Sequence, residues 1–326
     1  MITTSDIFTI SSQKQFEKIA LQVFRFQYDN NQAYREFCQL LKTKKQDIKS
    51  LQQIPFLPIQ FFKSHRVVSN YNPIQETFTS SGTTGMIASK HLVTDVSIYE
   101  ESYRRGFSQF YGNIKDYTIL ALLPSYLERE GSSLIYMVRD LIALSNNSNS
   151  GFYLNQYDEL IKKLIDLDHS GQNVILIGVT YALLDLIELN KFQLKNTIIM
   201  ETGGMKGKRK EMIREELHEQ LCIGFGVSTI HSEYGMTELL SQAYSLGNGV
   251  FECPPWMQIL IRETEDALSY VANGKTGGIN VIDLANINSC SFIATQDLGK
   301  KNPYNSFEVL GRFDNSDIRG CNLMVI

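Results

Sequence analysis

The sequence has few cysteines, and they form none of the spacings typical of metal sites or disulfide frameworks. The five cysteines are scattered, odd in number and free of any CxxC pair: Cys38, Cys222, Cys253, Cys290 and Cys321. This usage is typical of a reducing compartment and excludes a disulfide-stapled scaffold. The histidines show no HxxxH or HxH pairing, so we expect no histidine metal site.

Long hydrophobic runs are also absent. No apolar run approaches the roughly 18 residues of a membrane-spanning helix. Residues Met1 to Ile10 lack the basic and apolar regions of a signal peptide, so we expect a cytoplasmic protein. With 22 glycines and 7 prolines in 326 residues, a collagen-like chain is excluded as well. The length allows one large domain or two.

Neither sign of charge dominates. The chain has 31 Lys+Arg and 35 Asp+Glu, a formal net charge of −4, which argues against nucleic acid as the main partner. The densest basic stretch, from Lys206 to Arg214, runs into Glu215 and Glu216. We interpret this stretch as the solvated face of a helix.

Hydrophobic periodicity predicts helices first and alternating strands and helices later. A capping-box pattern at Ser12–Gln15 precedes apolar residues at helical spacing, and Pro55 and Pro58 end this helical part, residues 1–70. Apolar runs then predict strands at 173–179, 197–200, 279–284, 291–295 and 307–310, and helices at 181–189 and 208–221. This alternation predicts an α/β fold with at least a partly parallel sheet.

A run of small hydroxyl residues and glycines is the sharpest feature: Ser80, Ser81, Gly82, Thr83, Thr84 and Gly85. Glycines let a backbone approach an anion closely, and successive amides and hydroxyls can surround phosphate oxygens. The run is not the GxxxxGK[ST] loop, because no lysine follows its second glycine. Taken alone, it fits either a phosphate-binding loop or an ordinary turn.

Three further motifs follow in order. They are Tyr234-Gly235-Met236-Thr237-Glu238, the Asp297 segment at 295–299, and Gly311-Arg312-Phe313-Asp314. Together with the Ser80–Gly85 loop, this order resembles the adenylate-forming superfamily of acyl- and aryl-CoA ligases over roughly residues 75 to 320. Without the shared order, Glu238 would be interpreted as a surface carboxylate at a helix start and Asp297 as a turn residue.

The resemblance implies a role for each matching residue. The loop from Ser80 to Gly85 would cover the β- and γ-phosphates of ATP, and Gly203 and Gly204 would lie along the adenine. Tyr234, followed by Gly235, would flank the adenine ring, and Thr237 would bind the α-phosphate. Glu238 would hold Mg²⁺, a hard cation that prefers carboxylate oxygens. Asp297 would accept hydrogen bonds from the ribose hydroxyls, with Arg312 nearby.

A second resemblance covers nearly the whole chain. Glu201-Thr202-Gly203-Gly204-Met205-Lys206-Gly207, His231 to Glu238 and Asp317-Ile318-Arg319-Gly320-Cys321 look like the acyl-protein synthetase (LuxE-type) family. It implies an adenylate-forming large-domain fold over 1–310, with mixed, partly parallel sheets flanked by helices. A short tail, 311–326, would replace the usual mobile small domain. In that family a fatty acid is activated as acyl-AMP and then moves to a cysteine near the C-terminus, here Cys321.

Two departures from the ligase pattern leave questions open. The hinge motif is stretched by one residue after Asp314, and the lysine that the small domain normally supplies is missing. Either Lys90, Lys206 or Arg129 replaces that lysine, or a partner supplies a cation, or adenylation is slow or lost. Cys321 itself is interpreted either as the acylated nucleophile, with Arg319 lowering the pKa of its thiol, or as a small buried residue of a last strand. His231 is interpreted as a base, an acyl-pocket residue or a hydrogen-bonded structural residue.

These observations predict an ATP- and Mg²⁺-dependent ligase that activates a carboxylic acid, expected to be a fatty acid. Its thiol acceptor is expected to be Cys321, which would hand the acyl group to a reductase, transferase or carrier protein. The alternatives are transfer to coenzyme A or a carrier-protein thiol, and a nucleotide-binding subunit that has lost catalysis.

Overall fold

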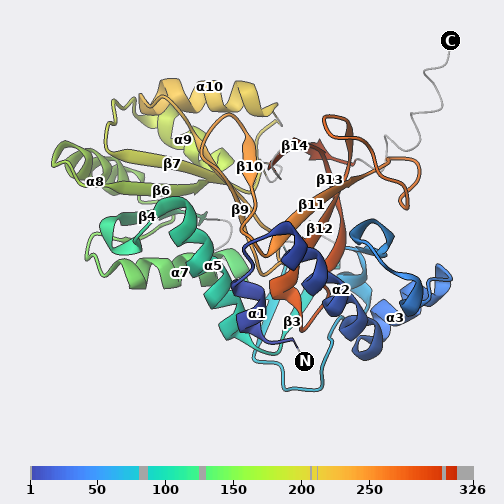
Figure 1. Cartoon of the computed structure of the whole chain (residues 1–326). Helices are drawn as coiled ribbons and strands as arrows, with labels where there is room; N and C mark the ends of the chain where they lie inside the picture. Colours follow the sequence, from blue (N-terminus) through green and yellow to red (C-terminus); the bar gives the residue numbers. More distant parts are fainter. Residues whose placement is uncertain are drawn as a thin grey trace, which may run out of the picture. The chain divides into compact units, whose positions relative to one another are not determined.

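The computed structural model describes residues 2–80, 87–124, 130–205, 208–210, 212–302 and 306–313. The chain divides into two units, each assembled from separate segments (Figure 1). One, here called the N/C unit, comprises Met1–Ile74, Leu92–Thr94 and Pro255–Ile326. The other, the central unit, comprises Gln75–His91 and Asp95–Pro254.

The N/C unit packs helices of the N-terminal part against strands of the C-terminal part. Its helices are α1 (Thr4–Phe8), α2 (Gln13–Asn30), α3 (Gln32–Leu40) and α4 (Phe61–Ser64), with short 3-10 turns at Lys45–Asp47, Leu51–Gln53 and Leu284–Asn286. Its strands are β1 (Leu57–Pro58), β11 (Met257–Arg262), β12 (Thr276–Asp283), β13 (Phe292–Lys301) and β14 (Ser306–Arg312). Strands β11, β12, β13 and β14 are antiparallel neighbours in that order, and β1 pairs in parallel with β13.

Sequence and packing agree in the helical start. Ser12 caps α2 by accepting a hydrogen bond from the Gln15 backbone amide, which is one half of the predicted capping box. The Gln15 side chain accepts from the Ser11 amide and not from the Ser12 amide. The buried Gln27 side chain donates to the carbonyl oxygens of Asn286 and Ile287, which fixes α2 to the connection between β12 and β13. Phe24 packs edge-to-face against Phe292, with ring centroids 6.3 Å apart.

The central unit is built on one twisted sheet with helices on both faces. Its strands run in the order β10 (Val250–Glu252), β9 (Ala243–Ser245), β8 (His231–Tyr234), β7 (Thr197–Thr202), β6 (Val174–Val179), β4 (Thr118–Leu122) and β5 (Gly151–Tyr153). From β8 to β5 the neighbours are parallel, whereas β9 is antiparallel to both β8 and β10. The nearly continuous apolar run of β6 is buried at all six positions, as predicted for an inner parallel strand.

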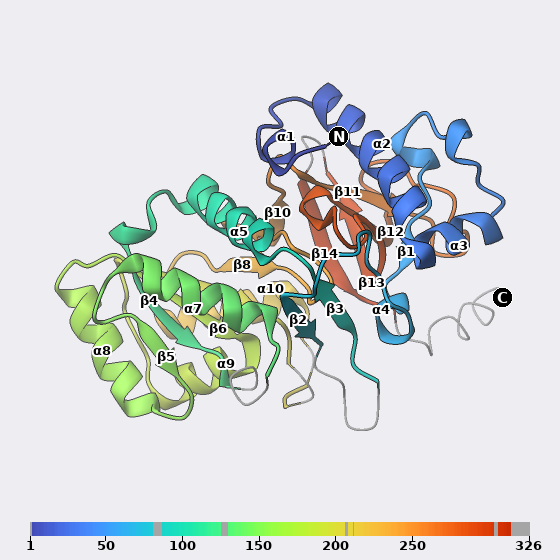
Figure 2. The ribbon, with the colours of Figure 1, turned by 90° about the horizontal axis from the view of Figure 1, so that it is seen from below.

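The helices of this unit are α5 (Val96–Tyr111), α7 (Ser133–Ser145), α8 (Tyr157–His169), α9 (Thr180–Leu189) and α10 (Arg214–Phe225), with a 3-10 turn at Ile114–Asp116. Helices α5 and α7 cover one face of the sheet, and α9 and α10 cover the other (Figures 1 and 2). A two-stranded sheet joins β2 (Glu76–Thr79) to β3 (Lys90–Val93). Within the described residues, no helix is long and apolar enough to cross a membrane.

The predicted helix at 208–221 is wrong in its start, because α10 begins at Arg214. Cations at a helix N-terminus oppose the helix dipole, whereas Glu215 and Glu216 in the first turn of α10 favour it. Arg209 lies before the helix and forms ion pairs with Asp185 and Glu188 of α9. The basic stretch is therefore not one solvated helix face.

Candidate active site

Two of the motifs lie where neighbouring parallel strands end. Gly203 and Gly204 follow β7, and Tyr234 ends β8. The two strands are in register at their ends, since Thr202 is the partner of Glu233. Ligands of α/β proteins bind beyond the carboxyl ends of parallel strands, so these two motifs occupy a favourable edge of the sheet.

The glycine pair after β7 leaves the edge of the sheet open. Gly203 has φ +73°, a left-handed conformation that favours glycine. A Cβ added at Gly204 would meet no atom within 4 Å. A flat ligand can therefore approach the backbone closely at this point.

The segment after β8 turns inward. Tyr234 is buried and packs edge-to-face on Phe251, with ring centroids 5.9 Å apart. Glu238 is only 5% exposed, and it lies in a turn. The alternative of a surface carboxylate at a helix start is therefore wrong.

A buried histidine holds the backbone of this segment. His91 of β3 is completely buried, and its Nδ1 lies 2.8 Å from the carbonyl oxygen of Thr237. Because a carbonyl oxygen only accepts, the Nδ1–H must donate, and this contact fixes the tautomer. The hydrogen bond ties the motif at 234–238 to β3, one residue after Lys90.

The base of the glycine-rich loop is closed by hydrogen bonds. Ser80 donates its amide to the Ser89 carbonyl, and its hydroxyl accepts from the Ser89 amide at 2.8 Å. Lys90 begins β3 and is exposed. The other loop residues, Ser81, Gly82, Thr83, Thr84 and Gly85, lie outside the described residues, as do Arg129, Lys206 and Cys321.

The expected ribose-binding pair meets within the N/C unit. Asp297 of β13 is the register partner of Arg312 of β14, and Arg312 Nε donates to Asp297 Oδ1 at 3.2 Å. Asp297 is 6% exposed and lies within a strand, so the alternative of a turn residue is wrong. Arg312 is largely exposed at the strand end.

Two buried glutamates lie on opposite faces of the central sheet, because side chains alternate along a strand. Glu201 of β7 contacts α10: Arg214 Nη1 lies 2.6 Å from Glu201 Oε1, and His218 Nε2 lies 3.6 Å from the same oxygen. Burial acts to raise the pKa of Glu201, but the His218 imidazole, the Arg214 guanidinium and the Ser232 hydroxyl together lower it. Glu201 is thus a charged carboxylate that Arg214 and His218 stabilise, and these contacts join β7 to α10.

Glu233 of β8 lies on the α5 and α7 face, in an apolar surrounding. Thr202 Oγ1 donates to Glu233 Oε2 at 2.5 Å. Burial raises the pKa of Glu233 to about 7, the Thr202 hydroxyl lowers it, and the Glu201 charge raises it further. A Cβ at Gly235 would collide with Glu233 Oε1, so the glycine of this motif makes room for the Glu233 side chain.

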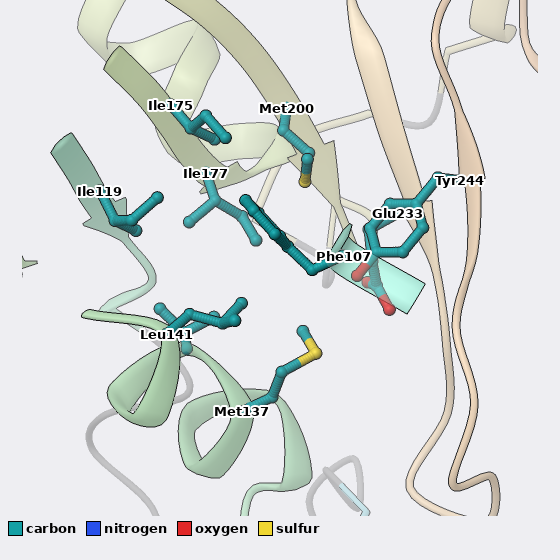
Figure 3. A pocket seen from close by; sticks show the side chains of 10 residues that line it. Phe107, Ile119, Met137, Leu141, Ile175, Ile177, Met200, Glu233 and Tyr244 are labelled. Carbon is teal, nitrogen blue, oxygen red and sulfur yellow. The ribbon is translucent and has the colours of Figure 1, made fainter. Parts of the chain in front are cut away.

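Glu233 also lines a cavity of about 20 Å³ under the sheet (Figure 3). The remaining walls come from α5, α7 and the strands β4, β6, β7 and β9: Phe107, Ile119, Met137, Val138, Leu141, Ile175, Ile177, Met200 and Tyr244. A cavity of this size has room for about one water molecule. Met137 and Met200 in this wall are flexible, polarizable side chains of the kind that fill irregular apolar space.

The family is decided by a match over the whole chain. The model of the family described as acyl-protein synthetase, LuxE, matches residues 1–326. The chain belongs to this family. It is thus a ligase-type acyl-protein synthetase.

Curated relatives of this acyl-protein synthetase agree with the assignment. A protein of Aliivibrio fischeri named long-chain-fatty-acid--luciferin-component ligase is 22% identical over 347 residues, covering 99% of this chain and 91% of the relative. The protein of the same name from Vibrio harveyi is 20% identical over 345 residues, covering 98% and 90%.

Solved structures share the fold. An open conformation of 2-hydroxyisobutyryl-CoA ligase, in complex with 2-HIB-AMP and CoA, has a TM-score of 0.66 and 11% identity, covering 93% of this chain and 70% of that one. ATP-bound MatB from Rhodopseudomonas palustris has a TM-score of 0.55 and 16% identity. The match covers 75% of this chain and about half (49%) of MatB. The predicted adenylate-forming α/β fold with a mixed sheet is confirmed.

The described residues fit a Mg²⁺ ion that is shared with substrate phosphates better than a metal ion held by protein side chains alone. The described residues contain no group of three or more His, Cys, Asp or Glu side chains that could hold a metal ion. Mg²⁺ is commonly held by one or two carboxylates together with substrate phosphates and water. The buried carboxylate of Glu238 fits that pattern as one such ligand.

Sequence reasoning missed two residues. His91 belongs to no HxxxH or HxH spacing, and Glu233 stands in the sequence only as one residue of the motif from His231 to Glu238. His231, by contrast, shares a hydrogen bond with the Tyr111 hydroxyl, which lies 3.2 Å from its Nδ1; burial lowers the pKa of His231, and it is not among the ten cavity residues. These contacts favour the structural interpretation of His231.

Proposed function

We propose that this acyl-protein synthetase activates a fatty acid with ATP as acyl-AMP and transfers the acyl group to a thiol, with Cys321 as the acceptor. The observation that carries the proposal is the alignment of the Gly203-Gly204 and Tyr234–Glu238 motifs at the ends of the neighbouring parallel strands β7 and β8. The names of the relatives combine a long-chain fatty acid with a luciferin component, and the family is described as acyl-protein synthetase; these support a fatty acid as the substrate and a protein as the acceptor.

The first step joins the acid to AMP. A carboxylate oxygen of the fatty acid attacks the α-phosphorus of ATP, and pyrophosphate leaves. Thr237 would bind the α-phosphate, Gly203 and Gly204 would lie along the adenine beside Tyr234, and Asp297 with Arg312 would bind the ribose. Ser80 and the loop from Ser81 to Gly85 would cover the leaving phosphates. Glu238 would hold Mg²⁺, which offsets the negative charge of the phosphates.

The second step moves the acyl group to sulfur. The thiolate attacks the acyl carbon, the thioester forms and AMP leaves. A thiolate is a strong nucleophile for this exchange. We assign Lys90 as the cation that offsets charge at the reacting carboxylate and phosphate, because it is exposed at the first residue of β3, the strand that follows the loop. ATP and a free thiol are both cytoplasmic reagents, so we keep the cytoplasm as the proposed location.

The apolar cavity supports an aliphatic substrate. Eight of its ten lining residues are aliphatic, methionine or phenylalanine side chains. We therefore propose that the acyl chain enters here, with adjustment of Met137 and Met200.

The test is intact-mass analysis after incubation with ATP, Mg²⁺ and a panel of fatty acids. We expect an acyl adduct on the wild type that Cys321→Ala abolishes, whereas the matched variant Cys222→Ala keeps it. If a thioester forms only on added coenzyme A, both in the wild type and in Cys321→Ala, the acceptor is an external thiol and not Cys321. If the protein binds nucleotide but catalyses no pyrophosphate exchange, it is a nucleotide-binding subunit and not an enzyme.

A further inference from the structure

Glu233 is the one carboxyl group among the ten residues that line the cavity. Figure 3 shows its carboxylate directed toward the interior beside the Phe107 ring, on the face where Met137 and Met200 also lie. Glu233 is 9% exposed, and Thr202 fixes one of its oxygens at 2.5 Å. The strand continues directly into the motif Tyr234–Glu238, so Glu233 is the cavity residue closest in sequence to that motif.

The groups that face Glu233 offer hydroxyls and apolar surface. Arg214 and His218 contact Glu201 on the other face of the sheet, so they balance the charge of Glu201 and not that of Glu233. From the elements packed around Glu233 come the following groups: Thr202 from β7, Tyr99 and Tyr111 from α5, Tyr244 from β9, the apolar residues of α7, and the isoleucines of β4 and β6. On β8 itself His231 shares the face of Glu233, and burial lowers the pKa of its imidazole. An ionised carboxylate in this surrounding is poorly stabilised.

We propose that Glu233 is a specificity-determining residue of the acyl pocket, which admits a carboxylic substrate while Glu233 is uncharged and disfavours it once Glu233 is ionised. The proposal rests on the assignment of this cavity to the acyl chain. A substrate brings its own carboxylate, and two negative charges close together in a low-dielectric site repel strongly. An uncharged Glu233 instead has a hydroxyl that can donate a hydrogen bond to that carboxylate.

The pH range in which this happens follows from the surroundings of Glu233. Burial raises the pKa of Glu233 to about 7, so the uncharged form dominates at pH 6 and the ionised form at pH 8. If only the uncharged form binds the acid, the KM of the acid rises about tenfold from pH 6 to pH 8. The KM of ATP has no reason to follow this curve.

The experiment measures pyrophosphate release with decanoate as the acid, ATP and Mg²⁺ between pH 6 and pH 8. We expect the wild-type KM for decanoate to rise about tenfold, and Glu233→Gln to keep the low value across the range. The exposed control Glu252→Gln on β10 should retain the wild-type curve. A flat wild-type curve, or a Glu233→Gln curve that rises like the wild type, overturns the proposal.

A second variant tests the same idea where Glu233→Gln does not fold. Thr202→Val keeps the side-chain shape and removes the hydrogen bond that lowers the pKa of Glu233. The rise in KM should then move to higher pH, and an unmoved curve argues against the role of Glu233.

Equilibrium binding of decanoate alone separates this proposal from the proposed function. If the wild type binds decanoate more weakly at pH 8 than at pH 6 but forms no acyl-AMP, the role of Glu233 is supported and the proposed reaction is overturned. A wild type that forms acyl-AMP but binds decanoate equally at both pH values removes the role of Glu233 and keeps the reaction.

Discussion

His91 Nδ1 donates a hydrogen bond to the carbonyl oxygen of Thr237 across 2.8 Å, and the imidazole that makes it is completely buried. The bond joins two segments that are 146 residues apart. One is the strand that begins with Lys90, and the other is the motif to which the α-phosphate and Mg²⁺ are assigned. His91 therefore positions the backbone of the segment Tyr234–Glu238, which we propose binds the nucleotide.

Replacing His91 should disturb nucleotide binding more than acid binding. His91→Phe fills similar space but leaves the Thr237 carbonyl without its donor, which costs about 1–3 kcal/mol for a buried group. We expect a lower unfolding temperature and a higher KM for ATP, with a smaller change in the KM for the acid. Thermal unfolding and initial-rate kinetics measure both.

A control and a rescue define the test of His91. The exposed His169→Ala on α8 should change neither quantity. His91→Asn, which retains an N–H donor, should recover part of the ATP affinity. Equal losses for ATP and for the acid would reduce His91 to a general stabiliser of the fold.

The ion pair of Glu201 and Arg214 should matter to stability far more than the pairs of Arg209. Glu201 is buried, so Arg214→Met leaves its carboxylate without the guanidinium, with only His218 and Ser232 beside it, and should cost about 3–5 kcal/mol at pH 7. Arg209→Met breaks more exposed pairs with Asp185 and Glu188 and should cost at most about 1 kcal/mol. Urea denaturation of both variants measures the difference.

The pH dependence of these variants has a definite sign. Because the pKa of Glu201 is lowered in the fold, its stabilising contribution is present above its ordinary value of 4.5 and is lost as the pH falls. In Arg214→Met the pKa of Glu201 rises, so its deficit relative to the wild type should shrink as the pH is lowered toward 4.5. A deficit that is the same at pH 5 and pH 7 would show that the Arg214 side chain stabilises by packing alone.

Part of this molecule follows directly from local sequence. The apolar runs at 173–179 and 197–200 predicted β6 and β7 because inner parallel strands are buried on both faces. The glycines after β7 and the motif after β8 then lie at strand ends. These features depend on a few consecutive residues, so they are visible in the sequence.

Other features depend on pairing between distant strands. The sequence does not show which face of β8 carries Glu233, because that is fixed by the register with β7 and by the packing of α5 and α7. The sequence around His91 does not show that its imidazole contacts Thr237, because β3 brings the two residues together from 146 positions apart. The start of α10 was misjudged because the acids of α9 that hold Arg209 are remote in sequence.

Glu238→Gln should weaken the use of Mg²⁺ with little effect on the fold. The variant keeps the size of a side chain that is 5% exposed and removes the charge that attracts a hard cation. We expect the Mg²⁺ concentration for half-maximal pyrophosphate release to rise roughly tenfold or more. Glu216→Gln on the exposed face of α10 is the control. An unchanged Mg²⁺ requirement would remove Glu238 from the proposed metal site.

Glu233→Gln should stabilise the protein at high pH and not at low pH. The folded state keeps the Glu233 proton between about pH 4.5 and about pH 7, a window in which the unfolded chain has released it. Each rise in pH within that window therefore favours unfolding of the wild type. A pKa shift of this size corresponds to at most about 3 kcal/mol, which Gln removes because it does not ionise. Urea denaturation at pH 5 and pH 8 should give a gain for Glu233→Gln that grows with pH, while Glu252→Gln shows none. A gain equal at both pH values would mean that Glu233 stays charged in the fold, and the pocket would then need another explanation for admitting an acid.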